Sequence, residues 1–217
     1  MIKLPEAVIF DWDNTLVDSL PIVEQAREIA FEKFKNYSKN EAVLGNINSP
    51  KSLFFMQFGD RADEAIQFFL SEYKKLSATG IEPFDGAHET LETISSLNIP
   101  MMIVSNKINT LLNQEVELLN WNKYFCRIVG SQDTPEDKPH SSPVYLALDS
   151  VNLSPSKDVW LIGDSTIDVK CAFNSGCHPI LFGDKEEFDP EEFKNIEIDH
   201  VTTHKELKNL FNSIKQY

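Results

Sequence analysis

The stretch AVIFDWDNTLVDS, residues 7–19, places two carboxylates at the end of an apolar run. Residues 7–10 are all apolar, which is typical of a strand buried on both faces of a parallel sheet. Asp11 follows directly and Asp13 comes two residues later. Two acidic side chains at the end of a buried strand suggest a polar site at that edge of the sheet.

Apolar runs of this kind recur and alternate with segments of helical spacing. They predict strands at 7–10, 99–104, 125–129, 159–162 and 179–182, with a weaker one at 196–201. One of the intervening helices is expected to run from Ile108. The alternation predicts an α/β fold, a Rossmann-like doubly wound parallel sheet whose ligands lie beyond the carboxyl ends of the strands.

The first connection is different because it is about 65 residues long, whereas loops in α/β units usually have about 2–6 residues. Between Thr15 and Pro83 the sequence shows helical periodicity and no convincing strand. We expect two domains: an α/β core formed by residues 1–15 plus 84–217, and an α-helical domain, residues 16–83, inserted after the first strand.

Composition limits the possible partners. The 217 residues carry a formal net charge of −14, which argues against nucleic acid because such binding depends on clustered Lys and Arg. The N-terminal residues contain neither a signal-peptide pattern nor an apolar stretch long enough for a membrane. We expect a cytoplasmic protein with no membrane partner, either a monomer or a homodimer.

Polar side chains occur at or just after four of the predicted strand ends. They are Asp11, Asp13 and Thr15, then Ser105, Asn106 and Lys107, then Lys138, and finally Asp164 and Asp168. Each alone has an ordinary structural explanation, since Asp caps helices, Ser and Asn form turns and a loop Lys is usually solvated. Together they would meet at one edge of a parallel sheet.

Four carboxylates at that edge would repel one another unless a cation compensates them. Oxygen ligands without His or Cys suit Mg²⁺, which commonly binds one or two carboxylates together with a phosphate oxygen. Lys138 and Ser105 would supply the positive charge and the donor that a tetrahedral oxyanion needs. The residues thus indicate a site that binds a phosphoryl group.

These motifs resemble the haloacid dehalogenase superfamily, in its phosphatase branch with a helical cap. The family pattern D-x-D-x-T is matched at Asp11 to Thr15, the strand-end Ser or Thr at Ser105, the Lys at Lys138-Pro139, and G-D-x-x-x-D from Gly163 to Asp168. The resemblance covers nearly the whole chain, including the position of the cap. The family commonly has Gly after the second Asp, where this chain has Asn14, a residue that tolerates the left-handed backbone.

The resemblance implies roles for the acidic residues. Asp11 would be the nucleophile that forms an aspartyl phosphate, and Asp13 would protonate the leaving group and then activate the hydrolytic water. Mg²⁺ would be held by Asp11, the backbone carbonyl of Asp13, Asp164 and Asp168, the last directly or through water. These are the residues that we expect to carry the metal chemistry.

It also implies contacts with the substrate. Ser105 and Lys138 would neutralise the phosphoryl oxygens, and Thr15 and Asn106 would line the substrate site. The cap segment LGNINSPKS, residues 44–52, would present Asn48 and Lys51 to the leaving group. Two alternatives stay open here: Asn106 and Lys107 can serve only as helix-capping or solvated residues, and Lys51 can be a solvated loop residue.

We expect a phosphoric monoester hydrolase that acts on a small phosphorylated metabolite, with a phosphoglycolate-like phosphomonoester favoured by the resemblance. Asp13 disfavours the dehalogenases of the superfamily, whose leaving halide needs no proton. The alternatives are a sugar phosphomutase of the same fold and a non-enzymatic phospho-acceptor module. A phospho-acceptor module would need neither Asp13 nor a cap.

Overall fold

The computed structural model describes residues 3–37, 50–184, 193–194 and 196–215. The chain divides into two compact units. Residues Ser19–Ile81 form one of them, and the chain on either side of this segment forms the other.

The larger unit is built on a six-stranded parallel sheet of order β5-β4-β1-β6-β7-β8. The strands are β1 Ala7–Phe10, β4 Met101–Ile108, β5 Phe125–Ser131, β6 Val159–Gly163, β7 His178–Phe182 and β8 Asp199–Val201. The first strand lies between β4 and β6, and all four of its residues are buried. The predicted parallel sheet is therefore confirmed, and its central strand is the one that leads into Asp11.

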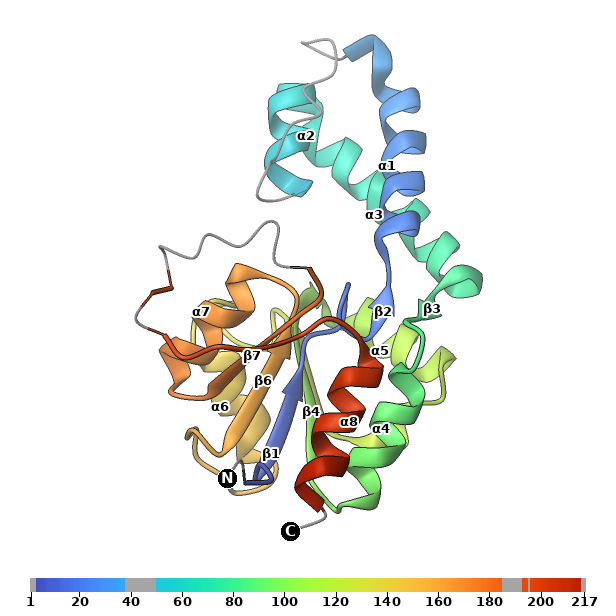
Figure 1. The fold of residues 1–217 in the computed structure, drawn as a ribbon. Helices are drawn as coiled ribbons and strands as arrows, with labels where there is room; N and C mark the ends of the chain where they lie inside the picture. The colour runs from blue at the N-terminus through green and yellow to red at the C-terminus, as the bar shows by residue number, and fades with distance from the viewer. Residues whose placement is uncertain (1–2, 38–49, 185–192, 195, 216–217) are drawn as a thin grey trace. The chain divides into compact units, whose positions relative to one another are not determined.

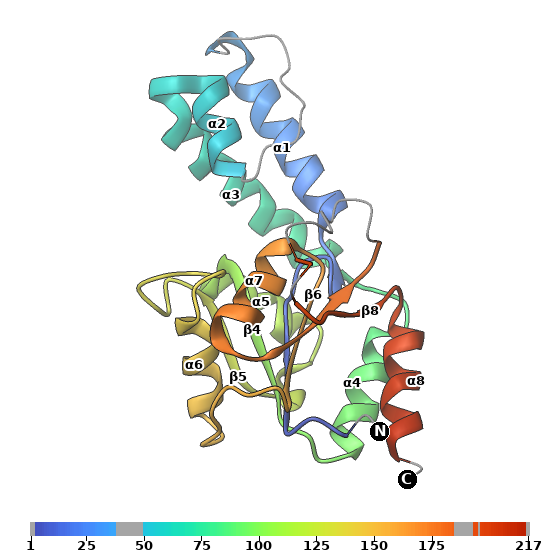
Figure 2. The same cartoon turned by 60° about the vertical axis from the view of Figure 1, so that its left-hand side comes forward.

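Helices cover both faces of this sheet (Figure 1). They are α4 Ala87–Ser96, α5 Asn109–Leu118, α6 Ser142–Asp149, α7 Thr166–Ser175 and α8 His204–Lys215, with a short 3₁₀ turn at Asn122–Tyr124. Figures 1 and 2 show α6 and α7 on one face and α4 and α8 on the other. This doubly wound arrangement confirms the predicted fold class.

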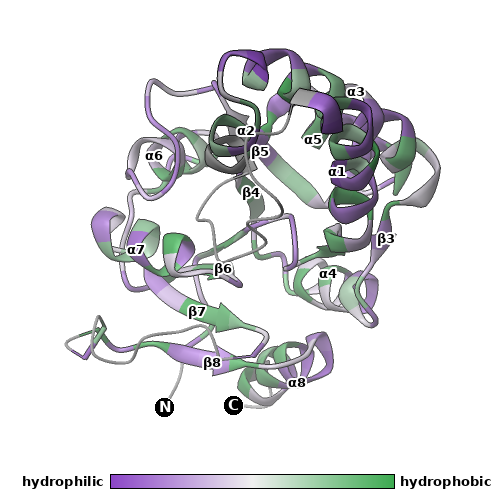
Figure 3. Ribbon diagram, turned by 90° about the horizontal axis from the view of Figure 1, so that it is seen from above, coloured by the Kyte–Doolittle hydropathy of each residue, from purple (hydrophilic) through white to green (hydrophobic). Residues whose placement is uncertain are grey.

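The core follows from the alternation of apolar side chains on the strands. Ile9, Met102, Val104 and Leu161 point into a buried cluster that α6 and α7 cover. Figure 3 shows the end of β7 as hydrophobic, whereas the helices carry both hydrophobic and hydrophilic residues. Helices with one apolar face on each side of an apolar sheet are what a three-layered α/β core requires.

The smaller unit contains α1 Leu20–Phe34, α2 Pro50–Phe58 and α3 Ala62–Gly80, with 3₁₀ turns at Lys35–Tyr37 and Gly59–Arg61. Its interior is aromatic: the rings of Phe31 and Phe54 meet edge to face at 5.3 Å, and Phe54 and Phe69 lie 5.4 Å apart. Phe54 and Phe58 are almost fully buried. Aromatic packing thus holds these helices together.

Two expectations need correction. Between Thr15 and Pro83 no strand is predicted, but β2 Val17–Asp18 and β3 Glu82–Pro83 pair as a short antiparallel ribbon. Two residues per strand are too few to show periodicity, and Pro83 argues against a strand. In addition, Ile108 is the last residue of β4, and α5 begins at Asn109.

Candidate active site

The loop after β1 carries the first two acidic residues. The Asp11 backbone N–H donates to the Ile162 carbonyl at 2.8 Å, so Asp11 continues the pairing of β1 with β6. The chain then turns tightly, because the Trp12 carbonyl accepts hydrogen bonds from Leu16 and Val17. Asn14 has φ of 56°, which agrees with its expected left-handed conformation.

Asp164 and Asp168 lie where β6 leads into α7. Ser165 caps α7: its side chain accepts from the Asp168 backbone N–H, and the Asp168 carboxylate accepts in return from the Ser165 backbone N–H at 3.1 Å. The position of Asp168 requires glycine at 163. A Cβ built on Gly163 would lie 2.3 Å from the Asp168 Cγ.

Lys138 joins the two connections. Its Nζ donates to one oxygen of Asp11 and one oxygen of Asp168, each at 2.6 Å, and it is almost completely buried. Burial lowers the pKa of Lys138, but the attraction of Asp11 and then Asp168 outweighs burial and holds the pKa above its usual range. Lys138 is therefore a fixed cation between the first and the last acidic motif.

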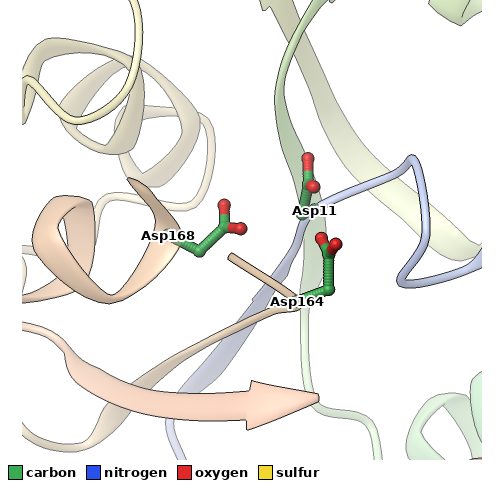
Figure 4. A group of neighbouring side chains, drawn as sticks. All are labelled: Asp11, Asp164 and Asp168. Carbon is green, nitrogen blue, oxygen red and sulfur yellow. The ribbon is translucent and has the colours of Figure 1, made fainter. Parts of the chain in front are cut away.

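Asp11, Asp164 and Asp168 come together as a group (Figure 4). Each can offer one carboxylate oxygen such that these oxygens lie within 4.8 Å of one another. Burial raises the pKa of Asp11 to about 6, against the opposing charge of Lys138. Burial, and then the charges of Asp11 and Asp168, raise the pKa of Asp164 to about 8.

The site is short of positive charge, since one ammonium faces three carboxylates. A hard divalent cation would relieve the repulsion, and a set of three carboxylates fits Mg²⁺ in ligand type. The side chain of Asp13 lies outside this group. Its predicted contribution to the metal is through the backbone carbonyl, and that stays a prediction.

Thr15 contacts one member of the group and is held by two hydrogen bonds. Its hydroxyl donates to Asp164 at 3.4 Å, and its carbonyl accepts from the Nε2 of His204 at 2.8 Å. Thr15 and His204 are both buried. Thr15 thus acts in this structure as a support for Asp164, and its predicted contact with substrate stays a prediction.

Ser105 and Asn106 lie where β4 bulges. Four steps along β4, from Val104 to Ile108, pair with two steps along β5, from Val129 to Ser131. Ser105 is buried. The side-chain amide of Asn106 donates to the Lys138 carbonyl and accepts from the Lys138 backbone N–H, both at 2.9 Å. The structure thus gives Asn106 a task that the sequence did not predict, which is to position Lys138.

Asp13 is held by Lys107, which is held in turn by Glu115, a residue that the sequence analysis did not single out. The Nζ of Lys107 donates to Asp13 at 2.5 Å and to Glu115 on α5 at 2.7 Å. Lys107 was expected to contact substrate or to be a capping or solvated residue, and it is instead largely buried in an ion pair. A signal for Glu115 existed in the sequence, because a carboxylate there interrupts the apolar stripe of a helix.

The structure does not place every candidate. Asn48 lies outside the described residues, and of Lys51 only the backbone is described, within α2. Both stay predictions. Among the described residues, no helix is both long enough and apolar enough to cross a membrane.

Comparisons with known proteins agree with this geometry. The model of the haloacid dehalogenase-like hydrolase family matches residues 8–182. A phosphoglycolate phosphatase of Aquifex aeolicus is 26% identical over 180 residues, covering 80% of this chain and 83% of that protein. The pyrophosphatase PpaX of Oceanobacillus iheyensis is 26% identical over 163 residues, covering 75% and 76%.

Solved structures show the same fold. A haloacid dehalogenase-superfamily hydrolase from Ehrlichia chaffeensis is 33% identical, with a TM-score of 0.70, and the match covers 99% of this chain and 100% of that one. A candidate beta-phosphoglucomutase of Thermotoga maritima has a TM-score of 0.75 at 19% identity, with 96% and 99% covered. The second likeness shows the fold alone.

We predicted an enzyme of the phosphatase type from this superfamily. The family match and the phosphatases among the relatives confirm that prediction. The four motifs that suggested it all lie in the larger unit, where the strand ends gather them. The chain belongs to the haloacid dehalogenase-like hydrolase family.

Proposed function

We propose that this enzyme is a Mg²⁺-dependent phosphatase that hydrolyses a small phosphomonoester through an aspartyl phosphate on Asp11. The observation that carries the proposal is the buried group of Asp11, Asp164 and Asp168 with Lys138 between two of its members. The group combines a carboxylate nucleophile, a set of hard ligands and a fixed cation. Phosphoryl transfer through an aspartyl phosphate uses these three parts.

In the first step an oxygen of Asp11 attacks phosphorus and the bond from phosphorus to the ester oxygen breaks. Asp13 gives its proton to the departing alkoxide. In the second step water attacks the aspartyl phosphate, its proton returns to Asp13, and inorganic phosphate leaves with Asp11 regenerated. Each displacement is easier than direct attack of water on the ester.

The remaining polar residues would stabilise the charge that spreads over the phosphoryl oxygens. Lys138 supplies a buried ammonium next to the Asp11 carboxylate, and Ser105 supplies a hydroxyl from the bulge of β4. Asn106 would keep Lys138 in place through its two hydrogen bonds to that backbone. Thr15, besides supporting Asp164, would complete the wall on the β1 side.

Mg²⁺ would be held by the carboxylates of Asp11, Asp164 and Asp168 and by the backbone carbonyl of Asp13. When bound it neutralises the carboxylates and polarises a phosphoryl oxygen. Burial raises the pKa of both Asp11 and Asp164, and the charges of neighbouring carboxylates add to the shift, which supports a cation at this place.

Substrate choice would belong to the inserted helices, which we propose form a cap, residues 16–83, on a core of residues 1–15 plus 84–217. Asn48 and Lys51 are the cap residues proposed to meet the leaving group. The phosphoglycolate phosphatase among the relatives supports a small anionic phosphomonoester, and the pyrophosphatase widens the choice to a phosphoanhydride. We place phosphoglycolate first because this relative covers more of the chain.

The test is phosphate release by the purified protein from a panel of phosphorylated metabolites, with Mg²⁺, with EDTA, and with Asp11→Asn. We expect turnover that needs the metal and disappears in the variant, with substrates ranked by kcat/KM. Transfer between positions of a sugar phosphate without net release would favour a mutase. Stable phosphorylation without turnover would favour a phospho-acceptor module.

A further inference from the structure

Glu115 is a fully buried carboxylate outside the motifs of the site. It lies on the inner face of α5, where the other buried residues are Leu111, Leu112 and Val116. An ionised carboxylate in such surroundings is costly unless charged or polar groups compensate it. The partners of Glu115 therefore indicate why it is there.

Two donors meet the same oxygen of Glu115. The Nζ of Lys107 donates to its Oε2 at 2.7 Å and the indole Nε1 of Trp12 donates to it at 2.8 Å. Trp12 is completely buried, its ring packs edge to face on Trp121 at 5.9 Å, and it is the residue between Asp11 and Asp13. Glu115 is thus tied directly to the loop that carries the two catalytic carboxylates.

Lys107 completes the connection. The same ammonium that donates to Glu115 donates to the Oδ1 of Asp13 at 2.5 Å. The side chains of Lys107 and Glu115 are 7% and 1% exposed, whereas that of Asp13 is 31% exposed. Packing therefore fixes Glu115 and Lys107, whereas Asp13, the proposed proton donor, is accessible to solvent.

Stability does not explain this arrangement well. Well-packed apolar residues in place of a buried ion pair often leave a protein equally stable or more so, because both ions lose their hydration. What the pair does supply is geometry, since an ammonium held by a buried carboxylate has few other positions to adopt. The ammonium in turn restricts the rotamers of Asp13.

We propose that Glu115 is a positioning residue that, through Lys107 and Trp12, holds the Asp13 carboxyl where it transfers a proton to the leaving group. The inference rests on the proposed phosphatase function and extends it to a residue outside the four motifs. Glu115 does not touch the substrate, and its effect is transmitted through the ammonium of Lys107.

Substrates with different leaving groups distinguish a loss of Asp13 positioning from general structural damage. The alkoxide of an alkyl phosphate needs a proton as it departs, whereas the phenolate of an aryl phosphate such as p-nitrophenyl phosphate does not. The parameter to measure is kcat/KM, because it covers only the steps up to departure of the leaving group and leaves out hydrolysis of the aspartyl phosphate. The preferred alkyl phosphate from the panel and p-nitrophenyl phosphate are compared in each variant.

For Glu115→Gln we expect kcat/KM to fall roughly tenfold or more for the alkyl ester, since a general acid contributes about 10²–10⁴-fold and the variant misplaces it rather than removing it. For the aryl ester the expected change is under about threefold. Asp13→Asn should show the same selectivity to a greater degree. Glu117→Gln, which removes a charge from an exposed residue of the same helix, is the matched control and should change neither value.

An equal loss on both esters, or no loss on either, would overturn the proposal. If Glu115→Gln does not fold, the double variant Lys107→Met with Glu115→Leu replaces the ion pair by apolar groups and decides in the same way, with a selective loss on the alkyl ester expected. Wild-type protein that cleaves neither ester would instead refute the proposed function, and Asp13→Asn without selectivity would refute the role of Asp13.

Discussion

Gly163 shows how a single residue without a side chain shapes the site. It ends β6, and the carboxyl group of Asp168 occupies the space that a Cβ at this position would need. The same carboxyl accepts from Ser165 and Lys138, so it has several constraints and little freedom to move. Gly163 therefore gives Asp168 its place between the helix cap and the proposed metal ligands.

For Gly163→Ala we expect Asp168 to be displaced, because a separation of 2.3 Å from its Cγ is far inside van der Waals contact. Overpacking of this kind typically costs about 1–3 kcal/mol of unfolding free energy. Urea unfolding measures that loss, and phosphate release measures the accompanying fall in activity.

Gly80→Ala is the control for this substitution. The Cβ there would meet the Ile22 Cδ1 at 3.8 Å, which is an ordinary contact, so the free energy of unfolding should not fall. Equal behaviour of the two variants would contradict the account of Gly163.

Helix α8 contacts the loop that follows β1 through its first residue. Its first residue, His204, is buried and donates from Nε2 to the Thr15 carbonyl. Its ring lies tilted against that of Phe182, with ring centroids 4.6 Å apart. Within the described part of the structure its Nδ1 has no hydrogen-bond partner. Burial lowers the pKa of His204 below its ordinary value of 6.5, so the folded protein favours the neutral ring.

The sign of the resulting pH dependence follows from linkage. The unfolded chain binds a proton at His204 at a higher pH than the folded chain does, so this contribution to stability is present above about pH 6.5 and is lost as the pH falls through the folded pKa. One proton corresponds to at most about 1.4 kcal/mol per pH unit.

The measurement is the free energy of unfolding of wild type and His204→Gln between neutral and mildly acidic pH. The wild-type curve should fall more steeply on acidification, and the difference between the curves removes the contribution of Asp11 and Asp164. Parallel curves would show that His204 does not titrate in this way.

At the scale of the whole molecule, the sequence predicted those features that depend on local patterns of apolar and polar residues. Buried strands need apolar runs, so every strand of the large sheet was located, and parallel strands bring their carboxyl ends together, so the residues of the motifs were expected as neighbours. Glu115 was missed because only the packing of α5 brings it to Trp12 and Lys107. The ribbon of β2 and β3 was missed because strands of two residues each are too short to show periodicity.

The metal should stabilise the whole fold, because the group of Asp11, Asp164 and Asp168 exists only in the folded state. At a Mg²⁺ concentration of 100 times the dissociation constant the gain in unfolding free energy is about 2.7 kcal/mol. Thermal unfolding with Mg²⁺ and with EDTA measures it. Asp164→Asn should lose most of the gain, whereas Asp149→Asn, at the exposed end of α6, should keep it. A gain that is unchanged in Asp164→Asn would place the metal elsewhere.

The proposed mechanism requires that Asp11 carries the phosphoryl group during turnover. The most direct measurement is rapid acid quenching during turnover with Mg²⁺, followed by peptide mapping for an acid-stable, base-labile acyl phosphate. With p-nitrophenyl phosphate, whose leaving group needs no proton, we predict phosphorylation of Asp11 in the wild type and more of it in Asp13→Asn, in which only hydrolysis of the intermediate is slowed. We predict none in Asp11→Asn. Phosphate release without any phosphorylated Asp11, or with the phosphoryl group on another residue, would contradict the mechanism.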